Sequence, residues 1–306
     1  MNCTNTNLPS FIKPESNDAQ RLFHGRGHIY DGLSHVCIDW YAPVVFIFFY
    51  EEVDQNWLNC LINRIQFEIP QCESIQVQFR CRQKSPVELF WGKTVKSLVV
   101  TEHQLKYQLI LSTNQNNGLF LDMSNGRKWV IENSKNKRVL NLFAYTCAFS
   151  VCAIAGGANY VLNLDMNKKA LSQGRANHQL NEQNLARIKY TGVNLFKSWS
   201  KLRREDKFNL LICDPPSYQK GSIDLSKDYK KIVKRIPEFM AENSDILLCI
   251  NAPNLDQEFI KNLIKDYCPD CIFQKQIENP KVFKDAHKGK GLKVMHFIFK
   301  PAKNEK

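Results

Sequence analysis

The stretch 208-FNLLICDPPSYQKG-221 carries the strongest indication of the fold of this chain. Its first six residues, Phe208 to Cys213, have the length and the apolar character of a buried strand. An acid, two prolines, a serine and a tyrosine follow directly. Proline cannot donate a hydrogen bond to a sheet, so the strand must end there, and two prolines restrict the backbone that follows. We therefore expect Asp214 and Tyr218 to occupy fixed positions at the carboxyl end of a buried strand.

The composition is typical of a globular protein with an excess of basic residues. The chain has 306 residues, 43% of them hydrophobic, and a formal net charge of +12. This length suits one large domain or two ordinary ones. An excess of lysine and arginine of this size favours an anionic partner, above all nucleic acid, and a merely basic soluble protein is the alternative.

The cysteines and the amino-terminal residues favour a reduced, cytoplasmic protein without a metal. There are 11 cysteines, an odd number, scattered along the chain as in proteins that keep their thiols reduced. One C-x-x-C pair, Cys268 and Cys271, lacks the second pair that a structural zinc site usually needs, so we expect no metal. Residues 1–20 have no secretion-signal pattern, and no apolar run reaches the ~18 residues of a membrane span.

The spacing of apolar residues divides the chain into three parts. Residues 1–18 are polar, and we expect a flexible tail there. Residues 19–113 predict a small α+β domain, a candidate for RNA binding, with a helix near Trp57. Within it, apolar residues from Ile75 to Cys81 alternate with glutamine and arginine, which predicts a strand with one wet, basic face.

Strand and helix patterns alternate from residue 114 to residue 306. This alternation predicts a parallel sheet with helices on both faces. We expect strands at 139–143, 160–165, 187–190, 208–213, 246–250 and 294–299, and helices at 149–155, 168–180, 228–241 and 257–267.

Several of these strands end at residues that suit a ligand site, because parallel sheets bind ligands outside the carboxyl ends of their strands. The stretch 141-NLFAYTCAFS-150 contains no glycine, which argues against the G-x-G-x-x-G phosphate cradle of NAD, FAD or ATP sites. Asp165 ends the second strand, where a carboxylate can accept hydrogen bonds from a ribose, although it could instead cap the next helix. Asn194 follows the third strand.

In this order, the residues resemble the class I S-adenosylmethionine-dependent methyltransferases, and more closely the group that modifies large-subunit (23S) ribosomal RNA. This resemblance implies an α/β fold, in which a Rossmann-like class I methyltransferase sheet with helices on both faces is preceded by a small β-rich α+β domain. The resemblance rests on 118-GLFLDMSNGRKWV-130, 139-VLNLFAYTCAFS-150, Asp165, 194-NLFKSW-199 and 214-DPPSYQK-220 with 228-DYKKIVKR-235, and it extends back to 24-HGRGHIYDGLSHVCIDWYAPVV-45.

The resemblance also implies roles for individual residues. Asp214, Pro215, Pro216 and Tyr218 would form the catalytic rim that faces the methyl group. Relatives carry two glycines where this chain has Cys147 and Ala148, and both replacements are small. The residues implied to bind S-adenosylmethionine are Asp122, Arg127, Asn141, Phe143, Tyr145, Thr146, Asp165, Asn194 and Asp214.

The residues of the rim and those after it suggest contacts with RNA. The ring of Tyr218 offers a face on which a splayed-out base can stack. Lys220, Lys230 and Arg235 follow and could contact phosphates, with a solvated helix face as the alternative for each. RNA, most readily ribosomal RNA, is therefore the expected partner, and we expect no membrane association.

The methylated atom depends on whether a cysteine can act as a nucleophile. Relatives that form 5-methylcytosine attack C6 of the base with a cysteine just after the fifth strand. Ala252 stands at that place here, and Cys249 falls inside the predicted strand. We therefore expect transfer to a base nitrogen, with 5-methylcytosine formation through Cys249 as an alternative. The sequence is also compatible with a methyltransferase that acts on a protein or a small molecule, and with a non-catalytic protein that binds RNA or the cofactor.

Overall fold

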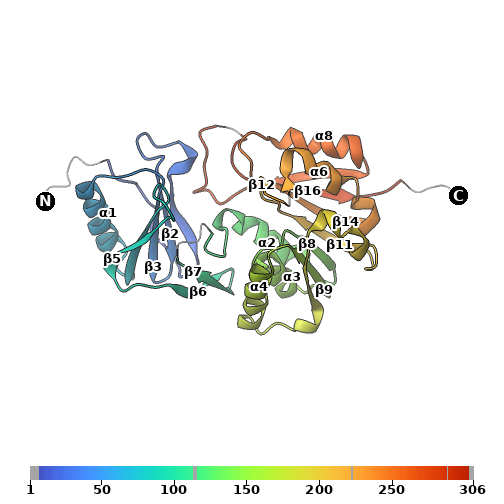
Figure 1. Ribbon diagram of the computed structural model, residues 1–306, viewed down its shortest axis with the longest axis horizontal. Helices are drawn as coiled ribbons and strands as arrows, with labels where there is room; N and C mark the ends of the chain where they lie inside the picture. The colour runs from blue at the N-terminus through green and yellow to red at the C-terminus, as the bar shows by residue number, and fades with distance from the viewer. Residues whose placement is uncertain (1–6, 113–115, 222, 288, 303–306) are drawn as a thin grey trace. The chain divides into compact units, whose positions relative to one another are not determined.

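The computed structural model describes residues 7–112, 116–221, 223–287 and 289–302, and the chain forms two compact units (Figure 1). The second unit is not one continuous stretch of chain, because a segment within it leaves to join the first. The first unit comprises Met1–Leu121 together with Pro280–Lys288, and the second comprises Asp122–Asn279 together with Gly289–Lys306.

The first unit contains a five-stranded sheet in the order β1-β2-β3-β4-β5, with one helix. Only β3 and β4 are parallel, and α1 connects them. Asp54 caps α1 by accepting hydrogen bonds from the backbone N–H groups of Asn56 and Trp57, so the helix predicted near Trp57 is confirmed. The elements of this unit are β1 (Gln20–His24), η1 (Gly25–Gly27), β2 (Val36–Tyr41), β3 (Val44–Phe49), α1 (Gln55–Glu68), β4 (Ser74–Phe79), β5 (Val87–Gly92), and the hairpin of β6 (Ser97–Glu102) and β7 (Leu105–Ile110).

Strand β4 differs from its prediction on one face. The expected wet, basic face is buried, because Gln76 and Gln78 are at most 1% exposed. The Gln76 amide donates to the Val95 carbonyl oxygen at 3.0 Å, and the Gln78 amide donates to the Ser112 carbonyl oxygen at 3.2 Å. The chain that follows β5 thus covers this face and satisfies its polar groups. An alternating strand pattern alone cannot distinguish a solvated polar face from a buried, hydrogen-bonded one.

Residues 7–18 pack on the first unit. The Phe11 ring is 8% exposed within the core, and the Trp40 indole N–H donates to the Ser16 carbonyl oxygen at 3.1 Å. The flexible tail expected over residues 1–18 is therefore not seen in this part, and residues 1–6 lie outside the described residues. One buried aromatic ring and a few backbone hydrogen bonds are enough to hold an otherwise polar segment in place.

The second unit contains a seven-stranded sheet in the order β10-β9-β8-β11-β14-β16-β15. The first five strands in that order are mutually parallel, and β16 and β15 complete the sheet with antiparallel pairing. The strand order reverses between β8 and β11, so this is the switch point at which such sheets bind ligands. The strands are β8 (Arg138–Leu142), β9 (Tyr160–Asp165), β10 (Ile188–Gly192), β11 (Phe208–Cys213), β14 (Met240–Ile250), β15 (Cys271–Ile277) and β16 (Lys293–Phe299).

Helices cover both faces of this sheet, which confirms the predicted α/β fold (Figure 1). Alternation along β8 separates the two faces, since Leu140 and Leu142 point toward α6 and α7 while Asn141 points toward α3. The helices α2, α3 and α4 lie on the Asn141 face, and the helices α5 to α8 lie on the other. Their bounds are α2 (Ser124–Asn133), α3 (Ala148–Ala155), α4 (Lys168–Leu180), α5 (Trp199–Leu202), α6 (Leu225–Val233), α7 (Ile236–Phe239) and α8 (Gln257–Tyr267).

Two stretches of the second unit depart from their predictions. The single helix expected over 228–241 is divided into α6 and α7, and β14 begins at Met240. Pro237 stands in the first turn of α7, where its missing N–H is tolerated, but it could not lie inside a continuous helix. Strand β15 was not predicted, because as an edge strand it is exposed over most of its length and lacks a clear apolar alternation.

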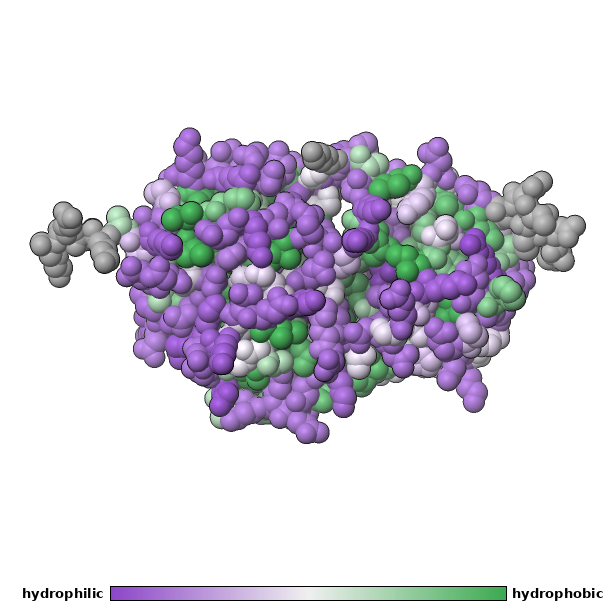
Figure 2. Space-filling model, turned by 180° about the vertical axis from the view of Figure 1, so that it is seen from behind, coloured by the Kyte–Doolittle hydropathy of each residue, from purple (hydrophilic) through white to green (hydrophobic). Residues whose placement is uncertain are grey.

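The surface is largely hydrophilic. On the face shown in Figure 2, hydrophilic residues predominate and hydrophobic residues form separate small groups. Among the described residues, no helix combines the length and the apolar composition needed to cross a membrane.

Candidate active site

The carboxyl ends of β8, β9 and β11 bring together segments that the sequence singled out. The loop 143–147 follows β8, Asp165 ends β9, and the rim 214–218 follows β11. These three strands are adjacent in the sheet, and the switch point lies between β8 and β11. The segments that follow β8 and β11 run to opposite faces of the sheet. This leaves room for a ligand between them.

The loop 143–147 has a strained backbone. Phe143, Tyr145 and Cys147 have φ angles of 57°, 47° and 60°, which place three non-glycine residues in the left-handed region. Each such residue costs on the order of 1–3 kcal/mol and persists only where surrounding contacts enforce it. One of these contacts is the hydrogen bond from the Ala144 N–H to the Leu164 carbonyl oxygen, at 3.1 Å. The loop is therefore anchored to the end of β9.

Asp165 connects the loop to β9. Its Oδ2 atom accepts a hydrogen bond from the Tyr145 N–H at 2.8 Å, and its Oδ1 atom accepts one from the Asn167 N–H at 2.7 Å. Burial raises the pKa of this carboxyl, and these backbone hydrogen bonds oppose the shift. Asn167 is the residue that caps α4, with its side chain accepting from two N–H groups of the first turn. Asp165 is therefore not the helix cap, and its remaining lone pairs can accept hydrogen bonds from a ligand.

Asp214 is a carboxyl group with a near-neutral pKa. Its pKa is raised from 3.8 to about 7, mainly by burial and also by the Asp122 carboxylate, while the Arg127 guanidinium opposes the shift. Asp122 lies in the short helix η2 (Leu121–Met123), and Arg127 lies in α2, where it is 2% exposed. Folding thus places these three predicted residues within electrostatic range of one another. A carboxyl group poised near neutral pH can accept or donate a proton under ordinary conditions.

The rest of the rim presents an aromatic ring to solvent. Pro215 is buried and Pro216 is exposed. Beyond them the chain forms a small hairpin of β12 (Tyr218–Gln219) and β13 (Ile223–Asp224), and the Leu225 N–H closes it by donating to the Ser217 carbonyl oxygen at 3.0 Å. The Tyr218 side chain is 68% exposed. An exposed ring on a rigid base suits stacking against a planar ligand.

Asn194 joins the end of β10 to this hairpin. Its Oδ1 atom accepts a hydrogen bond from the Phe196 N–H at 2.9 Å, and its Nδ2 atom donates to the Gly221 carbonyl oxygen at 2.9 Å. Both polar atoms of the side chain are thus engaged within the protein. The contact with adenine that the resemblance implies stays a prediction.

A buried chain of polar side chains lies beneath the loop, and only its first member, Asn141, was expected at the site. The Asn141 amide donates to Asn163 at 2.8 Å, and the Asn163 amide donates to the Ser150 hydroxyl at 2.9 Å. The Ser150 hydroxyl lies 2.9 Å from His178 Nε2, and burial lowers the pKa of that imidazole to about 4. The motif V-L-N-L occurs in both β8 and β9, and in-register pairing sets the two asparagines side by side. That repeat is the sequence signal that could have revealed the pair.

A residue of α4 also supports Thr146. It is 1% exposed, and its carbonyl oxygen accepts a hydrogen bond from the Asn177 side chain at 3.0 Å. The implied cofactor contacts of Asn141, Phe143 and Thr146 stay predictions, and what the structure describes is how the backbone around them is supported.

The basic residues differ in their suitability as phosphate ligands. Lys220, in the loop of the hairpin, and Lys230, on α6, are exposed. Arg235 lies beyond the carboxyl end of α6, whereas the rim precedes the amino end of that helix. Its guanidinium pairs with Glu238 at 2.6 Å and stacks on Trp199 at 4.9 Å. The structure therefore does not bring Arg235 to the rim.

Cys249 does not have the environment of a nucleophile. It is fully buried within β14, and burial raises its pKa well above the usual value, with Asp214 contributing in the same direction. Ala252, the position of the nucleophile in 5-methylcytosine-forming relatives, has no thiol and is 3% exposed. Reactive cysteines require a lowered pKa and access to the substrate.

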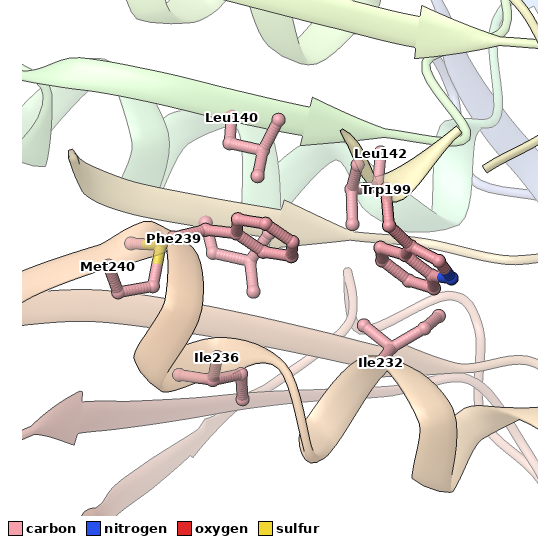
Figure 3. A pocket seen from close by; sticks show the side chains of 8 residues that line it. Leu140, Leu142, Trp199, Ile232, Ile236, Phe239 and Met240 are labelled. Atoms are coloured by element: carbon pink, nitrogen blue, oxygen red, sulfur yellow. The ribbon is translucent and has the colours of Figure 1, made fainter. Parts of the chain in front are cut away.

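An apolar cavity lies below the site, on the α6 face of the sheet (Figure 3). Its volume is about 10 Å³, the space of roughly one water molecule. Its lining is apolar apart from the indole of Trp199, so we interpret it as a packing gap. The residues that line it are Leu140, Leu142, Trp199, Leu211, Ile232, Ile236, Phe239 and Met240.

No metal site emerges within the described parts of the chain, where no group of three or more His, Cys, Asp or Glu residues is arranged to hold an ion. The Cys268 and Cys271 sulfur atoms lie 3.5 Å apart as a hydrogen-bonded thiol pair.

Comparisons with known proteins agree with this geometry. A family model described as S-adenosylmethionine-dependent methyltransferase matches residues 20–298. A crystal structure of a proposed methyltransferase complexed with SAH superimposes with a TM-score of 0.82 and 25% identity, and covers 92% of this chain and 75% of that one.

Two curated relatives have names that specify ribosomal RNA. Ribosomal RNA large subunit methyltransferase I of Shigella dysenteriae is 26% identical over 263 residues, which is 83% of this chain and 65% of that protein. Ribosomal RNA large subunit methyltransferase K of Neisseria meningitidis is 29% identical over 219 residues, which is 67% of this chain and 62% of that protein. The chain thus spans less than two thirds of the length of these relatives.

Proposed function

The chain belongs to the family of S-adenosylmethionine-dependent methyltransferases, and we propose that it methylates a base nitrogen of large-subunit ribosomal RNA. The observation that carries this proposal is the rim after β11, where Asp214, with a pKa near 7, precedes the exposed ring of Tyr218. The net charge of +12 and the names of the two curated relatives support RNA as the substrate.

The residues at the switch point fit S-adenosylmethionine. This cofactor has ribose hydroxyls and no phosphate, which suits a site with an acceptor at Asp165 and no glycine-rich cradle after β8. Asp165 is partly buried and keeps free lone pairs beyond its backbone hydrogen bonds. The residues we propose to surround the cofactor are Asp122, Arg127, Asn141, Phe143, Tyr145, Thr146, Asp165, Asn194 and Asp214.

The rim supplies the positioning that methyl transfer requires. When bound, S-adenosylmethionine provides a methyl group on a sulfonium centre, and the protein must align the target nitrogen with it. Tyr218 stacks on the flipped-out base, while Pro215 and Pro216 hold the backbone between that ring and Asp214. The Asp214 carboxylate accepts a hydrogen bond from an N–H of the base and can take the proton that this nitrogen loses as it becomes methylated. Lys220 and Lys230, which are exposed, contact phosphates in this proposal.

The buried state of Cys249 favours nitrogen over carbon as the target. Methylation of C5 of cytosine needs a thiolate that attacks C6, and neither Cys249 nor Ala252 offers one. A nitrogen of a base needs no covalent activation by the protein.

The test is mass spectrometry of ribosomal RNA nucleosides from cells with and without the gene. We expect one N-methylated nucleoside to be lost in the deletion, and to return with the wild type and with Cys249→Ala but not with Asp214→Ala. Loss of 5-methylcytosine instead, with no rescue by Cys249→Ala, would establish the carbon target. An unchanged set of nucleosides would contradict the ribosomal RNA substrate.

A further inference from the structure

Three arginines and three aromatic rings of the first unit alternate in one continuous stack. Arginine over an aromatic ring is a common pair, but a run of such pairs concentrates positive charge that repels itself unless an anion is bound nearby. We call this stack the arginine ladder, and its members in order are Arg26, Tyr50, Arg80, Phe48, Arg21 and Phe283.

The outer end of the ladder is at the surface. Arg26 lies in η1 and is exposed, with its Cζ atom 4.2 Å from the centre of the Tyr50 ring. The Arg80 Cζ atom lies 5.6 Å from the centre of the same ring. Among the described residues, Arg26 has no ion-pair partner. The Tyr50 ring therefore holds a charged, planar guanidinium at the surface without neutralising it.

The inner end of the ladder is neutralised. Arg21 pairs with Asp39 through two hydrogen bonds, of 2.5 and 3.1 Å. The Nδ1 atom of His24 lies 2.8 Å from Arg21 Nη1, so the imidazole is close to the positive charge of this guanidinium. Burial, together with the positive charges of Arg21 and Arg26, lowers the pKa of His24 to about 3. The imidazole thus stays neutral, and the positive charge available to a ligand lies at the Arg26 end.

The segment 280–287 adds one lysine, Lys284, to this end, with Asp285 directly after it in the chain. The Ala286 N–H donates to the Gly27 carbonyl oxygen at 2.7 Å, directly after Arg26 in the chain. Gly27 has to lack a side chain there, because a Cβ atom would lie 1.8 Å from the Lys284 carbonyl oxygen. The side chain of Lys284 is exposed. Close packing of this segment against Gly27 therefore places Lys284 near the outer end of the ladder, although it is distant in sequence.

We propose that the outer end of the arginine ladder binds a single-stranded segment of the RNA substrate. Arg26 and Lys284 contact phosphates, and the guanidinium plane of Arg26 stacks on a base. Charge complementarity selects this occupant, because RNA carries one phosphate per nucleotide and unpaired bases stack on arginine planes. The inference rests on the proposed RNA substrate and assigns part of its recognition to the first unit, which does not contain the residues proposed for methyl transfer.

The experiment measures binding of a fluorescein-labelled single-stranded 23S rRNA fragment by anisotropy at several salt concentrations. Arg26→Ala should raise the Kd about tenfold and lower the number of released counterions by about one. Arg26→Glu should raise the Kd further, and Arg26→Lys should restore the salt dependence but not the full affinity. The matched control is Arg64→Ala, since Arg64 on α1 also stacks on a ring, that of Phe11 at 5.4 Å, but is paired with Glu68 at 2.6 Å.

Each outcome bears on one of the two proposals. Wild-type binding retained by both Arg26→Ala and Arg26→Glu, or an equal loss in Arg64→Ala, would overturn the ladder proposal and leave the methyltransferase proposal intact. A wild-type protein that neither binds the fragment nor methylates ribosomal RNA would overturn the proposed function itself. Because Arg26 is exposed, the variants should keep the wild-type unfolding temperature and the wild-type Kd for S-adenosylmethionine.

Discussion

The loop 143–147 and the rim 214–218 both follow buried strands at the same edge of the sheet, but they are held in place in different ways. The rim contains Pro215 and Pro216, which restrict the backbone even in the unfolded chain. The loop has no proline, and it holds Phe143, Tyr145 and Cys147 in left-handed conformations that these residues disfavour. The rim is thus rigid because of its own residues, whereas the loop depends on its neighbours.

An important neighbour of the loop is α4. A Cβ atom on Gly174 would lie 2.4 Å from Cys147 Sγ and 2.8 Å from Cys147 Cβ, so α4 has a glycine where the thiol packs. Cys147 is fully buried there. Because of this difference, substitutions in the rim should alter methyl transfer directly. Substitutions in α4 should alter the conformation of the loop, although α4 is not part of it.

The largest effect is expected from Asp214→Ala, which removes the carboxylate of the rim. The rate of methyl transfer should fall by about 10²- to 10⁴-fold, the range for loss of an acid–base group. The Kd for S-adenosylmethionine should change much less, because the loop and Asp165 are untouched. Transfer of radiolabelled methyl to ribosomal RNA and calorimetric cofactor binding measure the two effects. A cofactor affinity that falls as far as the rate would make Asp214 mainly a cofactor ligand.

Gly174→Ala should distort the loop 143–147 although it replaces no residue of the loop or the rim. The new methyl group collides with Cys147, so the unfolding free energy should fall by about 1–3 kcal/mol and the Kd for S-adenosylmethionine should rise about tenfold. Adding Cys147→Gly should restore both, because glycine removes the thiol and tolerates a φ of 60°.

The double variant is what distinguishes this contact from general damage to α4. We expect a coupling of about 0.5–3 kcal/mol between the two substitutions, measured by denaturant unfolding of the four proteins. Additive effects would mean that Gly174 does not act through Cys147.

Tyr218→Ala should affect the rim on its substrate side. Loss of a stacking ring costs about 1–3 kcal/mol per base, which corresponds to a rise in KM for RNA of roughly tenfold. Tyr218→Phe keeps the ring and should behave like the wild type. Steady-state kinetics with an rRNA fragment provides the measurement, and an equal loss in both variants would show that the hydroxyl rather than the ring matters.

The smallest effect concerns stability and pH. Burial raises the pKa of Asp214 from 3.8 to about 7, so between these pH values the folded protein binds more protons than the unfolded chain. The contribution of this residue to stability therefore declines as the pH rises through that window. The side chain of the Asp214→Asn variant cannot ionise. The difference in unfolding temperature between this variant and the wild type (variant minus wild type) should therefore be larger at pH 8 than at pH 4. A constant difference across that range would show that folding does not shift the pKa of Asp214.

Regular elements of the second unit were predictable where burial is uniform. The strands β9 and β11 and the helices α4 and α8 begin and end at the predicted residues. Strands of a parallel sheet are apolar along their whole length, and both helices carry an apolar stripe, so short-range patterns define them. The exposed edge strand β15 and the break at Pro237 between α6 and α7 were missed, because there the pattern is weak or a single residue overrides it.

The grouping of candidate site residues was predictable where each follows a strand. Asp165 and Tyr145 come from consecutive strand ends, and their hydrogen bond is formed at the shared edge of the sheet. Gly174 could not be found in this way, because its role depends on how α4 packs against the loop. Similarly, nothing in the local pattern of 280–288 indicates that this segment packs beside Gly27 in the first unit.

By itself, the sequence determined the parallel sheet, the residues at the carboxyl ends of its strands and the proline-restricted rim, because these follow from local patterns of apolar residues, prolines and strand ends. The tertiary structure decided which residues meet across distant elements: Cys147 with Gly174, Asp214 with Asp122 and Arg127, and Arg26 with Tyr50 and the segment 280–288. The physical reason is that burial, backbone strain and pKa shifts depend on packing between segments, and packing is not encoded within any single segment.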